Sequence, residues 1–357
     1  MKKNELRRKE VLRRLVEEYI EHWEAVSSKQ ICHKYLPECS SATIRIDLNK
    51  LEKSDMIYQP HTSAGRIPTI KGYREYLNML QPEISEQSYN ANELLRNLLV
   101  QYYRDTPMAL HYIMQVLAKD TDQLSFVAEP QISYGYLEKL EVFHISARKL
   151  LFVVSLDSGL DKTVILNSEN EINPGQLKTI VRHINEELGG LRIYDIQNKY
   201  LQEIQNKIGR ESALFKGFLE GLHHALSQIS SYYIHFDGSM KFLEQPEFDE
   251  RKSILTFLGF IQRQDNLINL MKRYDTKADY YVLMGEELVR PELIEYAMIF
   301  ARYEIYGVPG YLGIVGPVRM DFQKNIPLVR DFARTITETT KKGMMVKQNG
   351  RKAKRSQ

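Results

Sequence analysis

Residues 40–51, with the sequence Ser-Ser-Ala-Thr-Ile-Arg-Ile-Asp-Leu-Asn-Lys-Leu, constrain the fold more than any other segment of the 357-residue chain. Ile44, Leu48 and Leu51 are spaced i, i+4 and i+7, so they predict a short helix with one apolar face. An ordinary amphipathic surface helix would have the same spacing. The segments on either side therefore decide between a surface helix and a DNA-recognition helix.

A second short helix is expected just before this one. Ser27 and Gln30 have the spacing of a capping box, in which each side chain bonds to the backbone of the other residue. Pro37 ends that helix, because proline cannot continue a helix interior. A longer helix comes first, since residues 11–20 carry two parallel rows of apolar side chains. Three helices with a tight turn between the last two match a helix-turn-helix.

The loop after the third helix predicts a two-stranded wing. Residues 56–59 and 66–68 read as short strands, and Gly65 is expected to give the loop tip conformational freedom. His61 and Arg66 place polar or cationic groups where they could touch phosphate or a minor groove. A generic hairpin would also fit. A phosphate-cradling P-loop is not indicated, because no Lys-Ser/Thr pair follows Gly65.

Polar and small side chains occupy the outward face of the predicted recognition helix. Arg45 and Asn49 are expected to donate hydrogen bonds to base edges, and Ile46 to make an apolar base contact. Ser41 is also expected to cap the helix. Phosphate contacts are expected from Lys29, Ser41, Thr43 and Arg66. The complete set that we predict to contact DNA is Lys29, Ser41, Thr43, Arg45, Ile46, Asn49, His61 and Arg66.

Positive charge is concentrated at the two ends of the chain. The net charge is +3, but residues 1–80 carry +4 and residues 341–357 carry +7, which leaves −8 between them. This charge distribution is expected if the two ends of the chain contact a polyanion and the middle does not. Residues 343–357 have no apolar period and are expected to form a disordered basic tail. Such a tail would add nonspecific DNA affinity, modulate repression or only aid solubility.

Composition and cysteine usage favour a cytoplasmic globular protein. Apolar residues make up 43% and charged residues 27%, a balance that suits two or three domains. Cys32 and Cys39 are the only cysteines, which fits a reducing compartment, and with His33 they lack the fourth ligand and the spacing of a zinc site. No apolar run approaches the ~20 residues of a membrane span, and residues 1–5 do not begin a signal peptide.

The middle of the chain alternates helical and strand-like segments, as in an α+β domain. Continuous apolar runs such as residues 150–155 are typical of a strand that is covered on both faces. Strands are expected over residues 123–127, 137–145, 150–155, 162–166, 280–284, 301–306 and 311–315, and helices over about 88–117, 174–188, 326–339 and from about 291. A composition break near Gly189-Gly190 suggests that an insertion follows.

The insertion reads as helices around a hairpin. Residues 232–236 and 240–243 are the expected strands, and Asp237-Gly238 is a strong hairpin turn. Residues 254–261 and 267–271 carry apolar stripes at helical spacing. These stripes fit either an internal core or an exposed dimer seam.

Five blocks of sequence resemble one family, the HrcA heat-inducible transcription repressors. They are residues 40–51, 59–69, 71–74, 238–248 and 313–321, and together they span nearly the whole chain. The resemblance implies an α+β, multidomain fold with an N-terminal winged helix-turn-helix and a GAF-like central domain that holds an inserted dimerisation domain. It implies a winged helix at 1–85, a GAF-like domain at 86–190 and 280–342, an inserted domain at 191–279 and a basic tail at 343–357.

The resemblance also implies a function. Members of this family repress chaperone operons by binding an inverted repeat as homodimers, and the chaperonin keeps the repressor folded until misfolded clients occupy it during heat stress. Ile46 departs from the family, which usually has asparagine there, so the operator preference is open at that position. The alternative is a small-molecule-gated regulator that uses the GAF-like domain as its receptor.

No catalytic, metal or cofactor site is predicted. The sequence shows no nucleophile–base pair, acidic dyad or metal cluster, and the adjacent His223 and His224 would diverge by about 100° on a helix. Arg319 and Asp321 could line a pocket but are expected to form a structural ion pair. We therefore expect a DNA-binding regulator rather than an enzyme.

Overall fold

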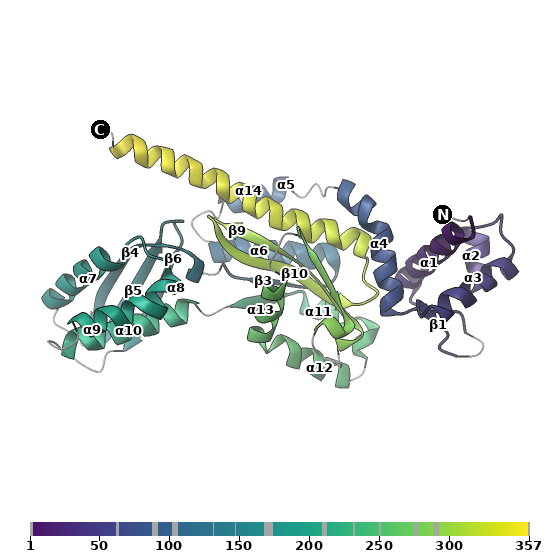
Figure 1. Cartoon of the computed structure of the whole chain (residues 1–357), viewed down its shortest axis with the longest axis horizontal. Coiled ribbons are helices and arrows are strands. Elements are labelled where there is room, and N and C mark those ends of the chain that lie inside the picture. The colour runs from purple at the N-terminus through teal and green to yellow at the C-terminus, as the bar shows by residue number, and fades with distance from the viewer. Residues whose placement is uncertain are drawn as a thin grey trace.

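The structure, a computed structural model, contains three domains in a row (Figure 1). It describes residues 3–61, 64–87, 92–101, 106–130, 132–146, 148–167, 174–208, 213–230, 233–249, 251–274, 278–288 and 293–355. A helical N-terminal domain is followed in the row by a central domain with a five-stranded sheet and a smaller domain with a three-stranded sheet. This confirms the α+β, multidomain class. Within the described ranges, every helix falls short of the length and apolar character that crossing a bilayer requires.

The N-terminal domain has three helices followed by a two-stranded hairpin and a fourth helix. Its elements are α1 Lys3–His22, α2 Ser28–Lys34, α3 Ser41–Lys53, β1 Ile57–Tyr58, β2 Ile67–Pro68 and α4 Ile70–Glu86. Burial of Ile44, Leu48 and Leu51 confirms the apolar stripe that the sequence predicts for α3. The antiparallel pairing of Ile57 with Pro68 confirms the two short strands.

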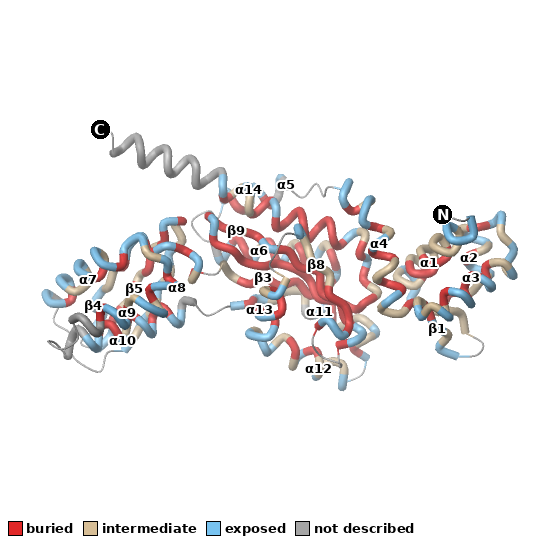
Figure 2. The backbone as a smooth tube through the Cα atoms, viewed as in Figure 1, coloured by how far each residue is buried: buried red, intermediate tan, exposed pale blue. Residues whose placement is uncertain are grey.

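The central sheet is antiparallel throughout, in the order β7-β3-β10-β9-β8. Its strands are β3 Leu124–Ala128, β7 Ile234–Asp237, β8 Tyr281–Met284, β9 Tyr296–Ile305 and β10 Val308–Pro317. β10 is buried along its whole length because strands flank it on both sides and helices cover both faces of the sheet (Figure 2).

The two faces of the central sheet belong to separate apolar cores. Along β9, Ile299 and Ala301 point into one core and Met298 and Phe300 into the other, as alternation along a strand requires. The first face is covered by α5 Asn92–Gln101, α6 Thr106–Thr121 and α14 Phe322–Arg355. The second is covered by α11 Ser239–Leu243, η3 Pro246–Phe248, α12 Arg251–Ile261, α13 Gln264–Arg273 and η4 Gly285–Leu288.

The third domain, called the inserted domain below, lies between β3 and β7 in the sequence. It contains η1 Ile132–Tyr134, β4 Leu137–Ser146, β5 Lys149–Leu156, β6 Asp161–Asn167, α7 Pro174–Leu188, α8 Ile193–Asp195, the π-helical turn η2 Ile196–Tyr200, α9 Leu201–Ile208 and α10 Ala213–Ser230. The sheet order is β4-β5-β6. Leu150, Phe152 and Val154 of β5 point into the core, where the rings of Phe152 and Phe218 lie 5.7 Å apart.

The boundary between the central and inserted domains differs from the prediction. The sequence and the family resemblance predict residues 86–190 in the central domain and 191–279 as the insertion. The structure instead places β4, β5 and β6 in the inserted domain, and packs residues 234–271 against the central sheet. The prediction is wrong because β3 pairs with β7 across the insertion, and local periodicity does not reveal a distant strand partner.

Three local predictions are also wrong. Residues 240–243 lie in α11 rather than in a hairpin strand, because Gly238, at φ +86°, turns the chain into a helix that carries Phe242 into the aromatic core. β9 begins at Tyr296, where a helix from about residue 291 was expected, and residues 289–292 lie outside the described ranges. α14 continues to Arg355, so residues 343–355 of the basic tail are helical.

An apolar core joins the N-terminal and central domains. It runs from Leu15 in α1 through Leu80 in α4 to Phe332 in α14. The rings of Tyr73 and Phe322 meet edge to face with their centres 6.2 Å apart. Because these buried side chains form one continuous core, the N-terminal and central domains pack against each other.

A cationic side chain adds a polar contact to this junction. The Arg319 guanidinium lies 4.6 Å from the centre of the Trp23 ring and donates to both carboxylate oxygens of Glu247, at 2.7 and 3.0 Å. Arg319 therefore forms an ion pair as predicted, but with Glu247 rather than with Asp321. Asp321 instead accepts from the Lys324 N–H at 3.0 Å, at the start of α14.

A side chain at position 72 should destabilise the start of α4. A Cβ at Gly72 would lie 2.0 Å from the Met56 carbonyl oxygen. Gly72→Ala should therefore lower the free energy of unfolding by about 1–3 kcal/mol, as other overpacked sites do. Chemical denaturation measures the change.

Gly217→Ala is the matched control for this substitution. Nothing lies within 4 Å of a Cβ at Gly217 in α10, so alanine there should be neutral or stabilising. Equal effects of the two substitutions would contradict the packing role of Gly72.

Candidate nucleic-acid interface

The outward face of α3 presents polar and cationic side chains to solvent. Arg45 and Asn49 are exposed, and Ile46 is 55% exposed whereas Ile44, two residues earlier, is fully buried. The contrast confirms that Ile46 points away from the core. With α2 and the hairpin, α3 lies toward the free end of the N-terminal domain, away from the inserted domain (Figure 1).

Local hydrogen bonds fix the start of α2 and the turn that follows it. Ser27 and Gln30 form the predicted capping box: the Gln30 N–H donates to Ser27 Oγ at 3.3 Å, and the Ser27 N–H donates to Gln30 Oε1 at 2.7 Å. The Cys32 thiol donates to the Cys39 carbonyl oxygen at 3.0 Å. The Cys32–Cys39 contact therefore stabilises the turn between α2 and α3.

Ser40, rather than Ser41, caps α3. The Ser40 Oγ accepts from the Thr43 N–H at 3.1 Å. The Ser41 hydroxyl lies 3.0 Å from that of Ser28 and so connects α2 with α3. The prediction was wrong by one residue because two adjacent serines offer the same capping chemistry. Ser41 and Thr43 are half-buried at the helix start.

A buried carboxylate inside α3 holds this helix against α1. Asp47 is fully buried; its Oδ2 accepts from Arg7 Nε at 2.6 Å, and Arg8 Nε lies 3.9 Å from its Oδ1. Burying a charge without such partners would cost several kcal/mol, roughly 3–5 if one partner is lost. Sequence reasoning missed Asp47, although its position three residues after Ile44, on the apolar face, was a usable signal.

A second buried carboxylate connects α1 with the end of α2. Glu18 is 5% exposed and accepts from Lys34 Nζ and from the Tyr35 hydroxyl. Burial alone would raise the pKa of Glu18, but the hydrogen bonds from Lys34 and Tyr35 outweigh burial and lower this pKa. The hydrogen bond to Glu18 in turn raises the pKa of Lys34. Both groups therefore stay charged at neutral pH.

The hairpin turns one predicted DNA contact outward and the other inward. His61 is exposed. The guanidinium of Arg66 instead lies against α3, where its Nε and Nη2 are both 3.1 Å from Glu52 Oε2. Thr62 and Ser63 lie outside the described residues. A phosphate contact by Arg66 stays a prediction, and it would compete with Glu52.

Gly65 serves a close backbone approach rather than a flexible tip. A Cβ at this position would lie 2.5 Å from the carbonyl oxygens of Ala25 and Val26. Val26 and Arg66 exchange backbone hydrogen bonds of 2.9 and 2.8 Å, so the segment before α2 pairs with the hairpin. The expectation that Gly65 frees the loop tip is therefore corrected, because the glycine lies where two backbones meet.

Cationic side chains surround the exposed face of α3. Lys29 of α2 and Lys50 and Lys53 of α3 are exposed, as is Arg45. Lys50 and Lys53 are absent from the set of residues predicted to contact DNA. A negatively charged backbone near this face would be attracted without regard to sequence.

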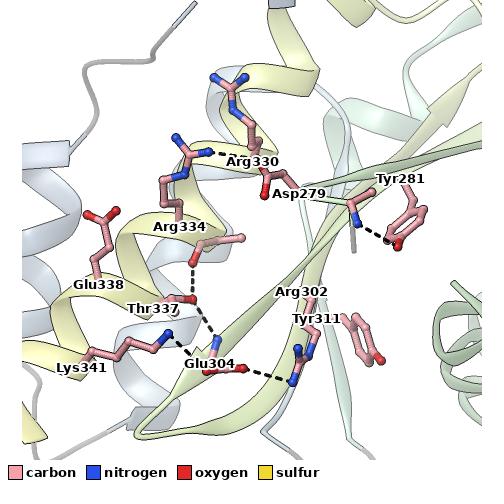
Figure 3. A pocket seen from close by; sticks show the side chains of 12 residues that line it. Asp279, Tyr281, Arg302, Glu304, Tyr311, Arg330, Arg334, Thr337, Glu338 and Lys341 are labelled. Atoms are coloured by element: carbon pink, nitrogen blue, oxygen red, sulfur yellow. Dashed lines mark hydrogen bonds and ion pairs between the residues drawn. The ribbon is translucent and has the colours of Figure 1, made fainter. Parts of the chain in front are cut away.

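A polar pocket of about 360 Å³ lies beside α14 and the central sheet (Figure 3). Five of its charged side chains pair with one another: Arg302 with Glu304 at 3.1 Å, Arg334 with Asp279 at 3.0 Å, and Lys341 with Glu304 at 3.6 Å. The other two pair outside the pocket, Arg330 with Asp331 at 2.8 Å and Glu338 with Arg96 at 4.0 Å. A small-ligand site usually directs a few polar groups at its ligand. This mutual pairing does not favour the small-molecule alternative.

Comparisons with known proteins agree on one family. The family model described as the HrcA protein C terminal domain matches residues 108–326. Over 336 residues the chain is 31% identical to the heat-inducible transcription repressor HrcA of Natranaerobius thermophilus, with 93% of this chain and 95% of that protein covered. Over 333 residues it is 28% identical to the same repressor of Pelotomaculum thermopropionicum, with equal coverage.

One solved structure shares the fold over most of the chain. It is the crystal structure of a hypothetical protein at 2.2 Å resolution, with a TM-score of 0.58 and 24% sequence identity. The match covers 93% of this chain and 98% of that chain. The arrangement of domains described above is therefore present in another protein.

The Glu18 contact should make the N-terminal domain sensitive to acid. A carboxyl group whose pKa is lowered by folding stabilises the fold above its unfolded pKa and loses that contribution as pH falls through its folded pKa. At neutral pH, Glu18→Gln should therefore cost about 1–3 kcal/mol of unfolding free energy. The difference from the unmodified protein should shrink as the pH falls below the ordinary value of 4.5.

Urea denaturation at a series of pH values measures this difference. Tyr35→Phe is the companion variant, because it removes one donor to Glu18 and keeps the ring. It should show a smaller effect of the same sign. A difference that stays constant from neutral pH to about pH 3.5 would contradict the charged role of Glu18.

Proposed function

The chain belongs to the HrcA family of heat-inducible transcription repressors, and we propose that it represses chaperone operons as a homodimer bound to an inverted-repeat operator. The observation that carries this proposal is the exposed face of α3, where Arg45, Ile46 and Asn49 stand beside surface lysines. Its relatives are named for regulation and not for catalysis.

In this proposal α2 and α3 form the helix-turn-helix and the β1–β2 hairpin is the wing. α3 enters the major groove, where Arg45 and Asn49 donate to base edges. Ile46 contacts a thymine methyl group, since its side chain offers no hydrogen bond. Backbone phosphates are held by Lys29, Ser41 and Thr43, with His61 and Arg66 from the hairpin.

The central domain is assigned in the same proposal as GAF-like. Numbered by their order in the chain, its five strands lie side by side as 2-1-5-4-3, with helices on both faces, and this arrangement supports the assignment. The boundaries of the sheet-forming segments follow the structure rather than the sequence prediction. A fold of this kind does not by itself imply a ligand.

The homodimer is proposed to form through the inserted domain. Helices cover one face of the β4-β5-β6 sheet, and the other face is apolar and open. Phe143, Leu151 and Ile165 form one cross-strand row on it, with Phe143 51% and Ile165 60% exposed, and Ile145 lies nearby at 50%. Exposed apolar surface of this kind marks an interaction site. A two-fold dimer then matches the two halves of an inverted repeat.

The proposed switch is loss of the folded repressor during heat stress. Folded domains are stable by only about 5–15 kcal/mol, so a modest change in conditions alters the active fraction. A chaperonin that refolds the repressor raises this fraction, and misfolded clients that occupy the chaperonin lower it. The open apolar face of the inserted domain would be recognised when it is not covered by a partner.

Arg45→Ala tests base reading by α3. The substitution should weaken binding to a family-type inverted repeat by about 1–3 kcal/mol and weaken binding to a scrambled duplex less. Fluorescence anisotropy at two salt concentrations measures both. Arg251→Ala, at an exposed position on α12, is the control and should bind like the unmodified protein. Equal losses on both duplexes would refute the base-reading role, and weak, salt-sensitive binding of the unmodified protein to both would refute the repressor proposal.

A double substitution tests the dimer surface. Phe143→Glu with Ile165→Glu places two charges on the apolar face and should convert the dimer to a monomer in sedimentation equilibrium. Operator binding should then weaken, because each half-site must bind separately. Met240→Glu is the control, since Met240 is 77% exposed but lies on α11 of the central domain. A double variant that stays dimeric would show that another surface makes the dimer.

Refolding assays test the proposed chaperonin dependence. After heating and cooling, the fraction of repressor that binds operator should be larger with chaperonin and ATP than without them. Adding an unfolded competitor protein should reverse the gain. An equal active fraction in all three mixtures would contradict this part of the proposal and leave DNA binding unaffected.

A further inference from the structure

β4 is an outer strand of the three-stranded sheet, and part of its free edge is open. At one end this edge is closed: Leu137 exchanges backbone hydrogen bonds with Gly190 and Leu191, and the Asn185 side chain binds both the N–H and the carbonyl of Leu140, at 2.7 and 2.8 Å. Backbone groups face the same edge at every second residue. Val142 therefore presents its N–H and carbonyl to the open part of the edge.

His144, two residues after Val142, also presents its N–H and carbonyl to the open edge. Within the described part of the chain, neither Val142 nor His144 has a hydrogen-bond partner on that side of β4. An unpaired strand edge is a template for one more strand. The Asn185 amide already imitates such a strand at Leu140, and it shows that these outward groups accept a polar partner.

A groove runs along this open edge, between β4 and α7. Its volume is about 680 Å³, and Val142 of β4 and Leu177 and Val181 of α7 supply apolar walls. A strand edge beside a helix is the arrangement in which an extended peptide binds by adding a strand, with alternate side chains entering the groove. Phe143 lines the groove as well, although the other members of its exposed row, Leu151 and Ile165, lie on the other face of the sheet.

Unpaired positive charge flanks the groove. Lys178 and Arg182 of α7 line it and are exposed, and among the described residues neither has a carboxylate within ion-pair distance. Three carboxylates also line the groove: Glu141 is bound by Lys139 at 2.5 Å, whereas Glu138 and Glu186 adjoin Leu137 and Asn185 at the closed end, and Glu186 lies 3.8 Å from His183. The open part of the groove therefore complements acidic side chains.

We propose that this groove binds an extended peptide segment of a partner protein, antiparallel to β4, in which apolar and acidic side chains share one face. An apolar side chain would lie against Val181, and acidic side chains two residues on either side would approach Lys178 and Arg182. The inference is independent of DNA binding.

Labelled heptapeptides test the groove. The probe Thr-Glu-Thr-Val-Thr-Glu-Thr places both glutamates and the valine on one face, and Thr-Lys-Thr-Val-Thr-Lys-Thr is its charge-reversed counterpart. Fluorescence anisotropy should show binding of the acidic probe only. Methylation of the valine nitrogen should abolish binding, because that N–H faces β4, whereas methylation of the nitrogen of the next threonine should not.

Substitutions on α7 complete the test. Lys178→Glu with Arg182→Glu should weaken binding of the acidic probe by about tenfold or more. Lys199→Glu, an exposed position elsewhere on the inserted domain, should leave it unchanged. Matching circular dichroism spectra and melting temperatures of all three proteins report that they are folded. Equal binding of the two probes would overturn the proposal, and so would binding of the probe with the methylated valine. Loss of the dimer in the double variant would also overturn it, because a second copy of the chain would then occupy the groove.

Discussion

The apolar core that continues from α1 through α4 into α14 fixes the direction in which α3 points. Rotating the N-terminal domain against the central domain would expose this surface at a cost of about 25 cal/mol per Å². Arg330 of α14 adds a polar restraint, because it donates to the Ile84 carbonyl at 2.7 Å and to that of Gln87 at the end of α4. In the proposed dimer, the spacing between the two α3 helices would then be decided by the dimer contact and not by a flexible linker.

Buried charged side chains fix the positions of the helices within the N-terminal domain, as the apolar core fixes the junction between the domains. Asp47 of α3 accepts from Arg7 of α1, and Glu18 of α1 accepts from Lys34 of α2, so the two carboxylates attach α3 and α2 to α1. An apolar contact tolerates small shifts, whereas a buried carboxylate must keep its donors or lose several kcal/mol. The angle between α2 and α3 is therefore set by a few directional contacts.

The sequence predicted contacts that are local and missed those that depend on distant partners. The stripe of Ile44 and Leu48, the Ser27 capping box and the exposure of Ile46 all follow from spacing within one helix. The roles of Asp47 and Arg66 depended on partners in other segments, which spacing does not reveal. The domain boundary failed for the same reason, since the partner of β3 lies beyond the whole inserted domain.

Glycines in the blocks that carry the family resemblance have structural roles. Gly72 lets α4 approach Met56, and a Cβ at Gly313 would lie 2.2 Å from the Ile299 carbonyl oxygen in the middle of the central sheet. Such positions specify the scaffold and allow few substitutions. Exposed positions on α3 are different, because surface substitutions usually change stability by about 0.5 kcal/mol or less. Ile46 can therefore replace a polar residue with little cost to the fold, and the base contacts proposed for this face could change while the scaffold stays the same.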